Sequence, residues 1–195
     1  MSGNTDRRVR RTRQAIQRAL VELILEKGYE PVTVTDLINR ADVGRSTFYA
    51  HFTDKQAVLF ANLDEIAFLH PAPRTDGPLF GFSLAMFEHV HEQRRLVRAL
   101  LGRRGGQMVV AHGEQLLQAV VRDELLARDG RASASLDLVV TCAVGAFMAL
   151  VRKWVDEEID ATPAELDAAF HATVVPGVQA MLARTRIQYG EPGPT

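Results

Sequence analysis

The sequence predicts an all-α protein, because apolar residues recur at helical spacing along most of the chain and no segment alternates convincingly as a strand would. Ile16, Leu20, Leu23 and Ile24 follow the i, i+4, i+7, i+8 pattern of one helix face. They predict a first helix over about residues 6–27. No internal repeat interrupts this pattern, so we expect a fold built from packed helices.

The charge of the chain is unevenly distributed. The 195 residues are 47% hydrophobic, which is enough to bury a core, and the net charge is −1. Residues 1–55 carry ten Lys or Arg against seven Asp or Glu, whereas residues 56–195 carry thirteen against seventeen. The first 18 residues hold six Arg and one Asp. Such a basic end is typical of a local polyanion site and equally of a solvated tail, so charge alone leaves both interpretations open.

Cysteine usage and apolar runs bear on the compartment. Cys142 is the only cysteine, so no intrachain disulfide can form, as is typical of a protein of the reducing cytosol. The basic N-terminal segment is not followed by an apolar stretch of signal-peptide type. The longest apolar run, residues 138–151, is short for a bilayer span and suits a buried helix. We therefore expect a cytoplasmic protein without a membrane partner.

Local capping signals divide the first 55 residues into helices. Gly28 is suited to the left-handed position after the first helix, and Pro31 prevents its continuation. Thr33 and Asp36 resemble a capping box and predict a short helix over residues 34–41.

The next signals predict a turn and two more helices. Asp42 tolerates the left-handed conformation of a tight turn, and Gly44 is an acceptable N-cap for a helix that ends near His51. Thr53 and Gln56 form a further capping-box pattern, which predicts a fourth helix.

The pattern of the remaining chain predicts a second helical domain. Residues 70–78 contain three Pro and one Gly and predict a linker, so we expect a first domain over residues 1–69 and a second over 79–187. The expected helices of the second domain cover about residues 79–92, 94–101, 107–127, 133–159 and 163–186. The Pro176–Gly177 pair is expected to kink or restart the last of them.

Two short helices joined by a tight turn form a device that reads DNA, with the second helix in the major groove. Here the second helix covers residues 45–51. Phe48 and Phe52 are spaced i, i+4 and are expected to face the core with Leu37. The opposite side of the helix then carries the polar residues Arg45, Ser46, Thr47, Tyr49 and His51.

Two cations at helix starts favour DNA. Arg45 and Lys55 both lie in the first turn of an expected helix, where the helix dipole disfavours positive charge by a few tenths of a kcal/mol. A nearby phosphate would reverse this preference, because helix N-termini and cations both bind anions. The alternative is that two exposed cations are simply tolerated there.

Residues 12–67 resemble the N-terminal domain of TetR-family transcriptional regulators, most clearly over residues 23–59. The resemblance is carried by linked features at fixed spacing: Gly28-Tyr29, Thr33, Ala41-x-Val43, Thr47-x-Tyr49, Phe52 and Lys55. Two positions depart from the family pattern, since Asp42 replaces the usual turn Gly and Gly44 replaces the usual capping Ser. Asp42 adds a negative charge that slightly opposes DNA binding.

The resemblance implies a set of contacts with double-stranded operator DNA. The residues implied are Thr33, Arg45, Thr47, Tyr49, His51 and Lys55. Thr33, Tyr49, His51 and Lys55 are expected to hold phosphates. Arg45, Ser46 and Thr47 are our candidates for reading base edges.

Beyond residue 78 the resemblance to the family is weaker, and it implies a helical domain that forms a homodimer through its last two helices and holds a small-molecule effector. Small residues on these helices permit close helix approach. The candidates for the dimer interface are Gly145, Ala149, Ala168 and Ala172, with packing inside one subunit as the alternative. Candidates for the effector pocket are Met86, Val90, Met108, His112 and Phe147.

Other chemistry finds little support in the sequence. His89 and His91 are spaced i, i+2 on an expected helix and make a poor metal pair, so we expect no metal and no cofactor. No nucleophile–base set supports an enzyme. The sequence therefore predicts a DNA-binding transcriptional regulator, a repressor released by an effector. The alternative is a TetR-like partner protein or coactivator that acts through protein–protein interaction without binding DNA.

Overall fold

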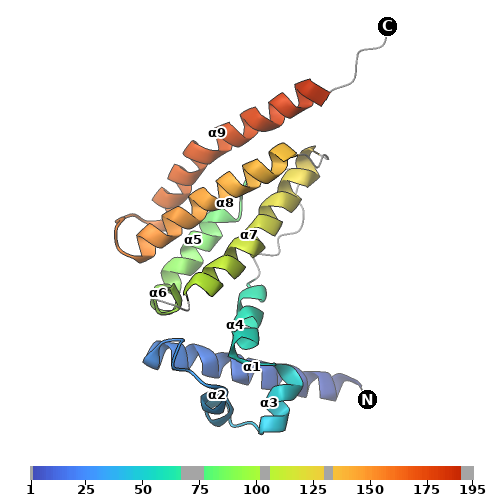
Figure 1. Ribbon diagram of the computed structural model, residues 1–195, viewed down its shortest axis with the longest axis vertical. Coiled ribbons are helices and arrows are strands. Elements are labelled where there is room, and N and C mark those ends of the chain that lie inside the picture. The colour runs from blue at the N-terminus through green and yellow to red at the C-terminus, as the bar shows by residue number, and fades with distance from the viewer. Residues whose placement is uncertain (1, 67–76, 102–105, 130–133, 190–195) are drawn as a thin grey trace. The chain divides into compact units, whose positions relative to one another are not determined.

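The computed structural model describes residues 2–66, 77–101, 106–129 and 134–189, and these residues form nine helices and no strand. Figure 1 shows their order along the chain. The helices are α1 Ser2–Lys27, α2 Val34–Ala41, α3 Arg45–His51, α4 Lys55–Asp64, α5 Ser83–Glu92, α6 Arg94–Leu101, α7 Gly106–Asp129, α8 Ala134–Val155 and α9 Pro163–Tyr189. The all-α prediction is confirmed.

The chain divides into two compact units. The first contains Met1–Ile66 and Gln93–Gly113, and the second contains Ala67–Glu92 and Glu114–Thr195. α6 and the start of α7 therefore belong with α1 to α4, because α6 packs on α1 in the first unit. The predicted domain limits at residues 69 and 79 remain a prediction, and the proposed linker lies largely outside the described residues.

The core of the first unit is built on the apolar face of α1. Ile16, Leu20 and Ile24 are at most 1% exposed and pack with Leu37 of α2 and Phe48 of α3. This cluster is the one expected from helical periodicity, and the phenylalanines of the second short helix lie in it as predicted. Burial of that face packs α1, α2 and α3 together around one core.

Local capping in the first unit largely follows the sequence. Gly28 has φ of +79° after α1, a conformation that a side chain would strain. Asp42 adopts φ 51° and ψ 51° in the turn between α2 and α3, and its N–H donates to the carbonyls of Ile38 and Asn39. The expected left-handed turn is therefore present without the usual glycine.

Several helix boundaries differ from the sequence-based expectation. The N-cap of α4 is Asp54 and not Thr53, because the Asp54 carboxylate accepts from the Ala57 N–H at 2.8 Å. α5 begins at Ser83 and not at residue 79, because Phe80 has φ of +60° and its N–H donates to the Glu124 carboxylate of α7. α9 continues through Pro176 as one helix, so the expected restart is absent, whereas the expected kink stays a prediction.

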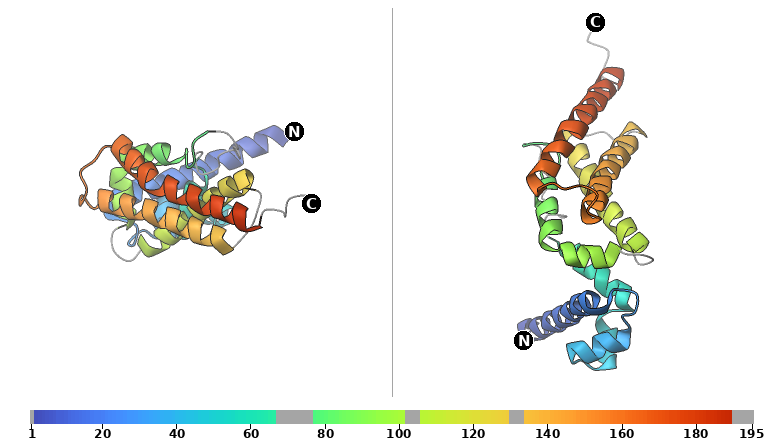
Figure 2. Two further views of the ribbon diagram at one scale, coloured as in Figure 1. Left: turned by 90° about the horizontal axis from the view of Figure 1, so that it is seen from above. Right: turned by 90° about the vertical axis from the view of Figure 1, so that its left-hand side faces the viewer.

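The second unit is held together by α5, α7, α8 and α9. α9 packs on both α5 and α8, and Figures 1 and 2 show α8 and α9 side by side. Its core is aromatic: Phe147 of α8 lies 4.6 Å from Phe87 and 5.4 Å from Phe170, measured between ring centroids. Trp154 is 2% exposed, and its indole N–H donates to the Ala161 carbonyl at 2.8 Å.

α8 is apolar enough to resemble a membrane span. Leu136–Val155 reaches the length and hydropathy of a spanning helix, but half of it is buried inside the protein. Phe147 and Trp154 on this helix contact aromatic side chains of α5. The buried side of α8 thus packs in the core of the second unit, which accounts for the apolar residues on that side.

A partly buried polar cluster joins α5 to α9. Ser83 is fully buried, and its Oγ lies 2.5 Å from Asp167 Oδ1 and 2.9 Å from His171 Nε2. Sequence reasoning found no nucleophile–base set, and this cluster was missed. Ser83 Oγ and Asp167 Oδ1 both lie near the same ring nitrogen of His171, Nε2. A catalytic triad uses the two different ring nitrogens of its histidine, so this arrangement differs from a triad.

Candidate DNA-binding interface

α3 presents a polar face outward from the first unit. Phe48 and Phe52 are buried, and the Phe48 ring lies edge-on to Tyr49 at 5.4 Å between centroids. On the outer side, Arg45 and Ser46 are exposed, and half of Tyr49 is exposed. Thr47 and His51, the other predicted contacts on α3, are partly exposed.

Gly44 caps α3 with its backbone alone. Its φ of −71° and ψ of 152° are the extended values of an N-cap, and no side chain caps the helix. A Cβ at Gly44 would lie 3.6 Å from Thr47 Oγ1, at ordinary contact distance. The family's usual serine would therefore fit here, and its absence leaves the first N–H groups of α3 available to an anion.

Thr33 and Asp36 form a complete capping box at the start of α2. The Asp36 N–H donates to Thr33 Oγ1 at 3.1 Å, and the Thr33 N–H donates to Asp36 Oδ2 at 2.8 Å. Lys27 Nζ donates to the same carboxylate oxygen at 2.9 Å. The hydrogen bond from Lys27, followed by those from Thr33, lowers the pKa of Asp36 well below its ordinary value. Thr33 is exposed, as a phosphate contact requires.

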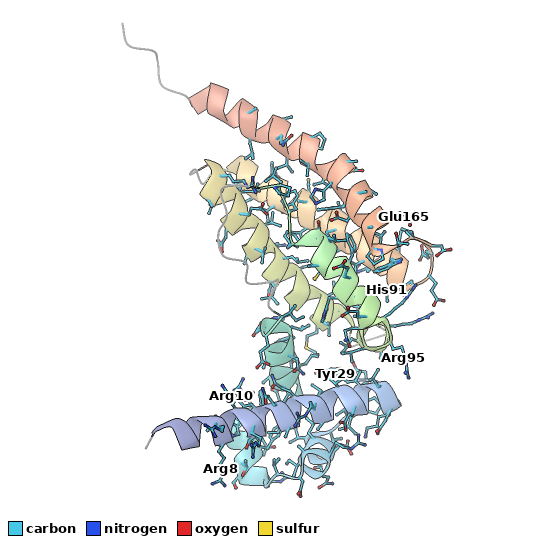
Figure 3. All side chains as sticks on the ribbon, turned by 180° about the vertical axis from the view of Figure 1, so that it is seen from behind. Arg8, Arg10, Tyr29, His91, Arg95 and Glu165 are labelled. Carbon is cyan, nitrogen blue, oxygen red and sulfur yellow. The ribbon has the colours of Figure 1, made fainter. Side chains whose placement is uncertain are left out.

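Lys55 makes contacts within the chain that the sequence did not reveal. Its Nζ donates to the carbonyls of Tyr29 at 3.1 Å and Glu30 at 2.9 Å, and it lies 4.5 Å above the Tyr29 ring. Figure 3 labels Tyr29 at this end of α1. Burial raises the pKa of Tyr29 to about 12. Lys55 therefore fastens α4 to the chain after α1, and one ammonium hydrogen remains for a phosphate.

Ion pairs fix α2 against α1. Arg40 of α2 donates to Glu26 at 2.7 Å and to Glu22 at 3.2 Å, both on α1. The pKa of Glu26 is lowered, chiefly by its hydrogen bond from Arg40. These contacts hold the helix that precedes the reading helix in register with α1, although each exposed pair contributes modestly.

The predicted effector residues are divided between the two units. Met86, Val90 and Phe147 lie in the second unit, where Val90 and Phe147 are buried in its core. Met108 and His112 lie in the first unit. His112 stacks on Phe60 at 3.9 Å between ring centroids, and its Nε2 lies 3.2 Å from Asp64 Oδ1. His112 thus has partners on α4 within the first unit.

The predicted dimer residues all lie on exposed faces. Gly145 and Ala149 are exposed on α8, and Ala168 and Ala172 are exposed on α9. A Cβ added at Gly145 would meet no atom within 4 Å. Leu138, on the same side of α8, is 64% exposed. These four small residues are therefore not buried inside the single chain, unlike in the alternative of packing within one subunit.

A buried-core helix-turn-helix with an exposed polar second helix defines a DNA-binding domain. Residues 16–61 match the family model described as bacterial regulatory proteins, tetR family. The chain is 30% identical to the HTH-type transcriptional regulator TcmR of Streptomyces glaucescens over 180 residues, which cover 87% of this chain and 73% of that protein. The protein belongs to the TetR family and is a DNA-binding transcriptional regulator.

Two further comparisons agree on the domain and on the fold. The HTH-type regulator YxbF of Bacillus subtilis is 40% identical over 55 residues, which are 28% of this chain and only 14% of that relative. The crystal structure of a TetR transcriptional regulator from Streptococcus agalactiae superposes with a TM-score of 0.65 at 24% identity, covering 89% of this chain and 99% of the other. This last likeness supports the two-part helical fold.

Proposed function

We propose that the protein is a cytoplasmic homodimeric repressor whose two α3 helices bind neighbouring major grooves of a palindromic operator. The observation that carries the proposal is the division of α3 into a buried aromatic face and an exposed polar face. On this proposal the phosphate contacts are Thr33, Tyr49, His51 and Lys55, and the base-reading residues are Arg45, Ser46 and Thr47. The alternative of a partner protein without DNA binding is favoured by none of the observations.

The exposed small-residue faces of α8 and α9 support a homodimer. Gly145 and Ala149 of α8, with Ala168 and Ala172 of α9, are exposed in the single chain, as a surface awaiting a second copy would be. Leu138 extends the α8 face with an apolar side chain. One short reading helix binds too little DNA for tight specific recognition, so two linked copies supply the required affinity.

Sedimentation of a Gly145→Trp variant tests the dimer. The substitution adds a bulky side chain where the single chain has open space, so the subunit is expected to fold while the dimer is blocked. Ala119→Trp, on the exposed side of α7, is the matched control and is expected to remain dimeric. A monomeric wild-type protein, both free and on DNA, would contradict the proposal. A dimeric Gly145→Trp protein would move the interface elsewhere.

We also propose that an effector binds the second domain, over residues 79–187, and weakens DNA binding of residues 1–69. Met86, Val90 and Phe147 are the candidates that the second unit itself contains. An effector acts only through different affinities for the DNA-fitting and non-fitting states, and DNA must weaken its binding by the same factor.

Transcription of a reporter behind the DNA upstream of the protein's own gene should rise when the protein is absent. Unchanged transcription would count against repression there.

A further inference from the structure

The N-terminal part of α1 carries positive charge that the first unit's core does not use. The apolar face of α1 that packs in the core begins at Ile16. Ahead of it, residues 7–11 are all exposed, and four of them are arginines: Arg7, Arg8, Arg10 and Arg11. Within the described residues no ion pair involves any of these four. Like charges three and four positions apart on a helix repel one another, so folding alone gives no reason for this cluster.

Helical geometry shows that two of these arginines lie on the side of α1 that faces the helix-turn-helix. Eighteen residues make five turns of an α-helix, so Arg8 points in the same direction as Glu26. Eleven residues make about three turns, so Arg11 repeats the direction of Glu22. Both glutamates are ion-paired to Arg40 of α2. Arg8 and Arg11 therefore share the α2 face of α1.

Arg10 lies on a different face. It precedes Gln17 by seven residues, or about two turns, and so repeats the direction of that side chain. Gln17 Nε2 donates to Glu65 Oε1 at 2.9 Å, at the end of α4. Arg10 is thus on the α4 side, and Figure 3 shows Arg8 and Arg10 on opposite sides of α1.

A contact at the base of this segment fixes its position near the reading helix. The Arg13 guanidinium lies 4.7 Å above the ring of Phe52, which is the C-cap of α3. α1 continues from this point as a helix to Ser2, and in Figure 1 its N-terminal end extends past α3. Arg11 and Arg8 precede Arg13 by two and five residues, which is roughly half a turn to one and a half turns, or about 3–8 Å along the axis.

We propose that Arg8 and Arg11 form a second DNA contact, which binds backbone phosphates of the duplex flanking the bases read by α3. The proposal rests on the proposed function of α3. Duplex DNA is the fitting occupant because its phosphates run continuously past the reading helix, and because guanidinium groups bind phosphate oxygens through paired donors. Neutralisation by phosphates also removes the repulsion among the arginines. The contact carries no base information and lengthens the footprint of each subunit.

The test compares an Arg8→Gln/Arg11→Gln double variant with Arg10→Gln as the matched control, in the full-length protein. The probes are a duplex selected by the wild-type protein from a random-sequence library and the same duplex with its sequence scrambled. Binding is followed by fluorescence anisotropy over a range of salt concentrations, and protection by hydroxyl-radical footprinting. Circular dichroism checks that each variant keeps its helix content. Loss of two phosphate contacts per subunit reduces the magnitude of the dimer's salt slope by about 4.

We expect the double variant to bind both duplexes at least about ten-fold more weakly near physiological salt, and to lose protection at the outer edges of the footprint. Arg10→Gln should keep the outer protection and most of the salt slope. An unchanged slope and footprint in the double variant would overturn the proposal, and so would equal losses in Arg10→Gln, which would indicate unspecific charge. Failure of the selection to enrich any sequence would instead refute the proposed function.

Discussion

Replacement of Lys55 by methionine separates its structural role from its proposed contact with DNA phosphate. Methionine keeps an apolar stem and removes the ammonium that donates to the carbonyls of Tyr29 and Glu30. A hydrogen bond to a charged group contributes about 1.5–3 kcal/mol when buried. One of these two is only partly buried and the other is exposed, so solvent screening reduces their sum to roughly 1–2 kcal/mol.

The contact of the ammonium with the Tyr29 ring adds about 0.5 kcal/mol at this partly exposed site. We therefore expect Lys55→Met to lower the free energy of unfolding by roughly 2 kcal/mol. In a chain of this size that corresponds to a fall in Tm of about 4–8 °C. Thermal unfolding followed by circular dichroism measures it, and Lys153→Met, which breaks an exposed ion pair with Glu158, serves as the control.

The same variant is expected to bind all duplexes more weakly, and its salt slope should shrink by about one unit for each lost lysine. An unchanged Tm would refute the structural role derived from the carbonyl contacts. An unchanged affinity and slope in a folded Lys55→Met protein would remove Lys55 from the DNA interface. The two readouts are independent, because stability is measured without DNA.

Three further changes test other contacts. Because the pKa of Asp36 is lowered in the folded state, the stabilisation from its contacts is fully present above about pH 4 and is lost as the pH falls further. In urea unfolding, the free energy of unfolding of Asp36→Asn should therefore fall less steeply than that of the wild type between about pH 4 and pH 2. An equal fall with pH in both proteins would contradict this. Thr33→Ala should lower the free energy of unfolding by about 1 kcal/mol through the lost cap and also weaken DNA binding; a variant with unchanged melting and binding would exclude both roles. Ser83→Ala should lower the free energy of unfolding by about 1–2 kcal/mol, measured by thermal unfolding, whereas Ser46→Ala at an exposed position should not. Equal melting temperatures of the two variants would argue against a stabilising role of the Ser83 cluster.

The sequence predicted the helix-turn-helix well because its determinants are local. The capping box of Thr33 and Asp36 spans three residues, and α2 and α3 begin and end where their caps and turn residues indicate. The spacing of Phe48 and Phe52 was sufficient to place one face of α3 in the core. The exposed polar face, and with it the candidate DNA-binding site, followed from the same periodicity.

The parts that were missed depend on contacts between distant residues. The start of α5 is displaced by a bond from Phe80 to Glu124, 44 residues later. Lys55 reaches carbonyls 25 and 26 residues earlier, and Ser83 meets partners 84 and 88 residues later. No local pattern announces such pairs. The α4 cap was misassigned because Thr53 and Asp54 are both good N-cap residues, and only the observed bond distinguishes them.

A comparison of affinities for two duplexes shows whether α3 reads the sequence of DNA. Wild-type protein and an Arg45→Ala/Thr47→Ala variant are titrated onto a duplex selected by the wild type and onto its scrambled counterpart at physiological salt. We predict that the wild type prefers the selected duplex by at least about 10³-fold, and that the variant loses most of this preference while retaining its weak binding to scrambled DNA. Equal preference in the two proteins would show that Arg45 and Thr47 of α3 do not read the sequence.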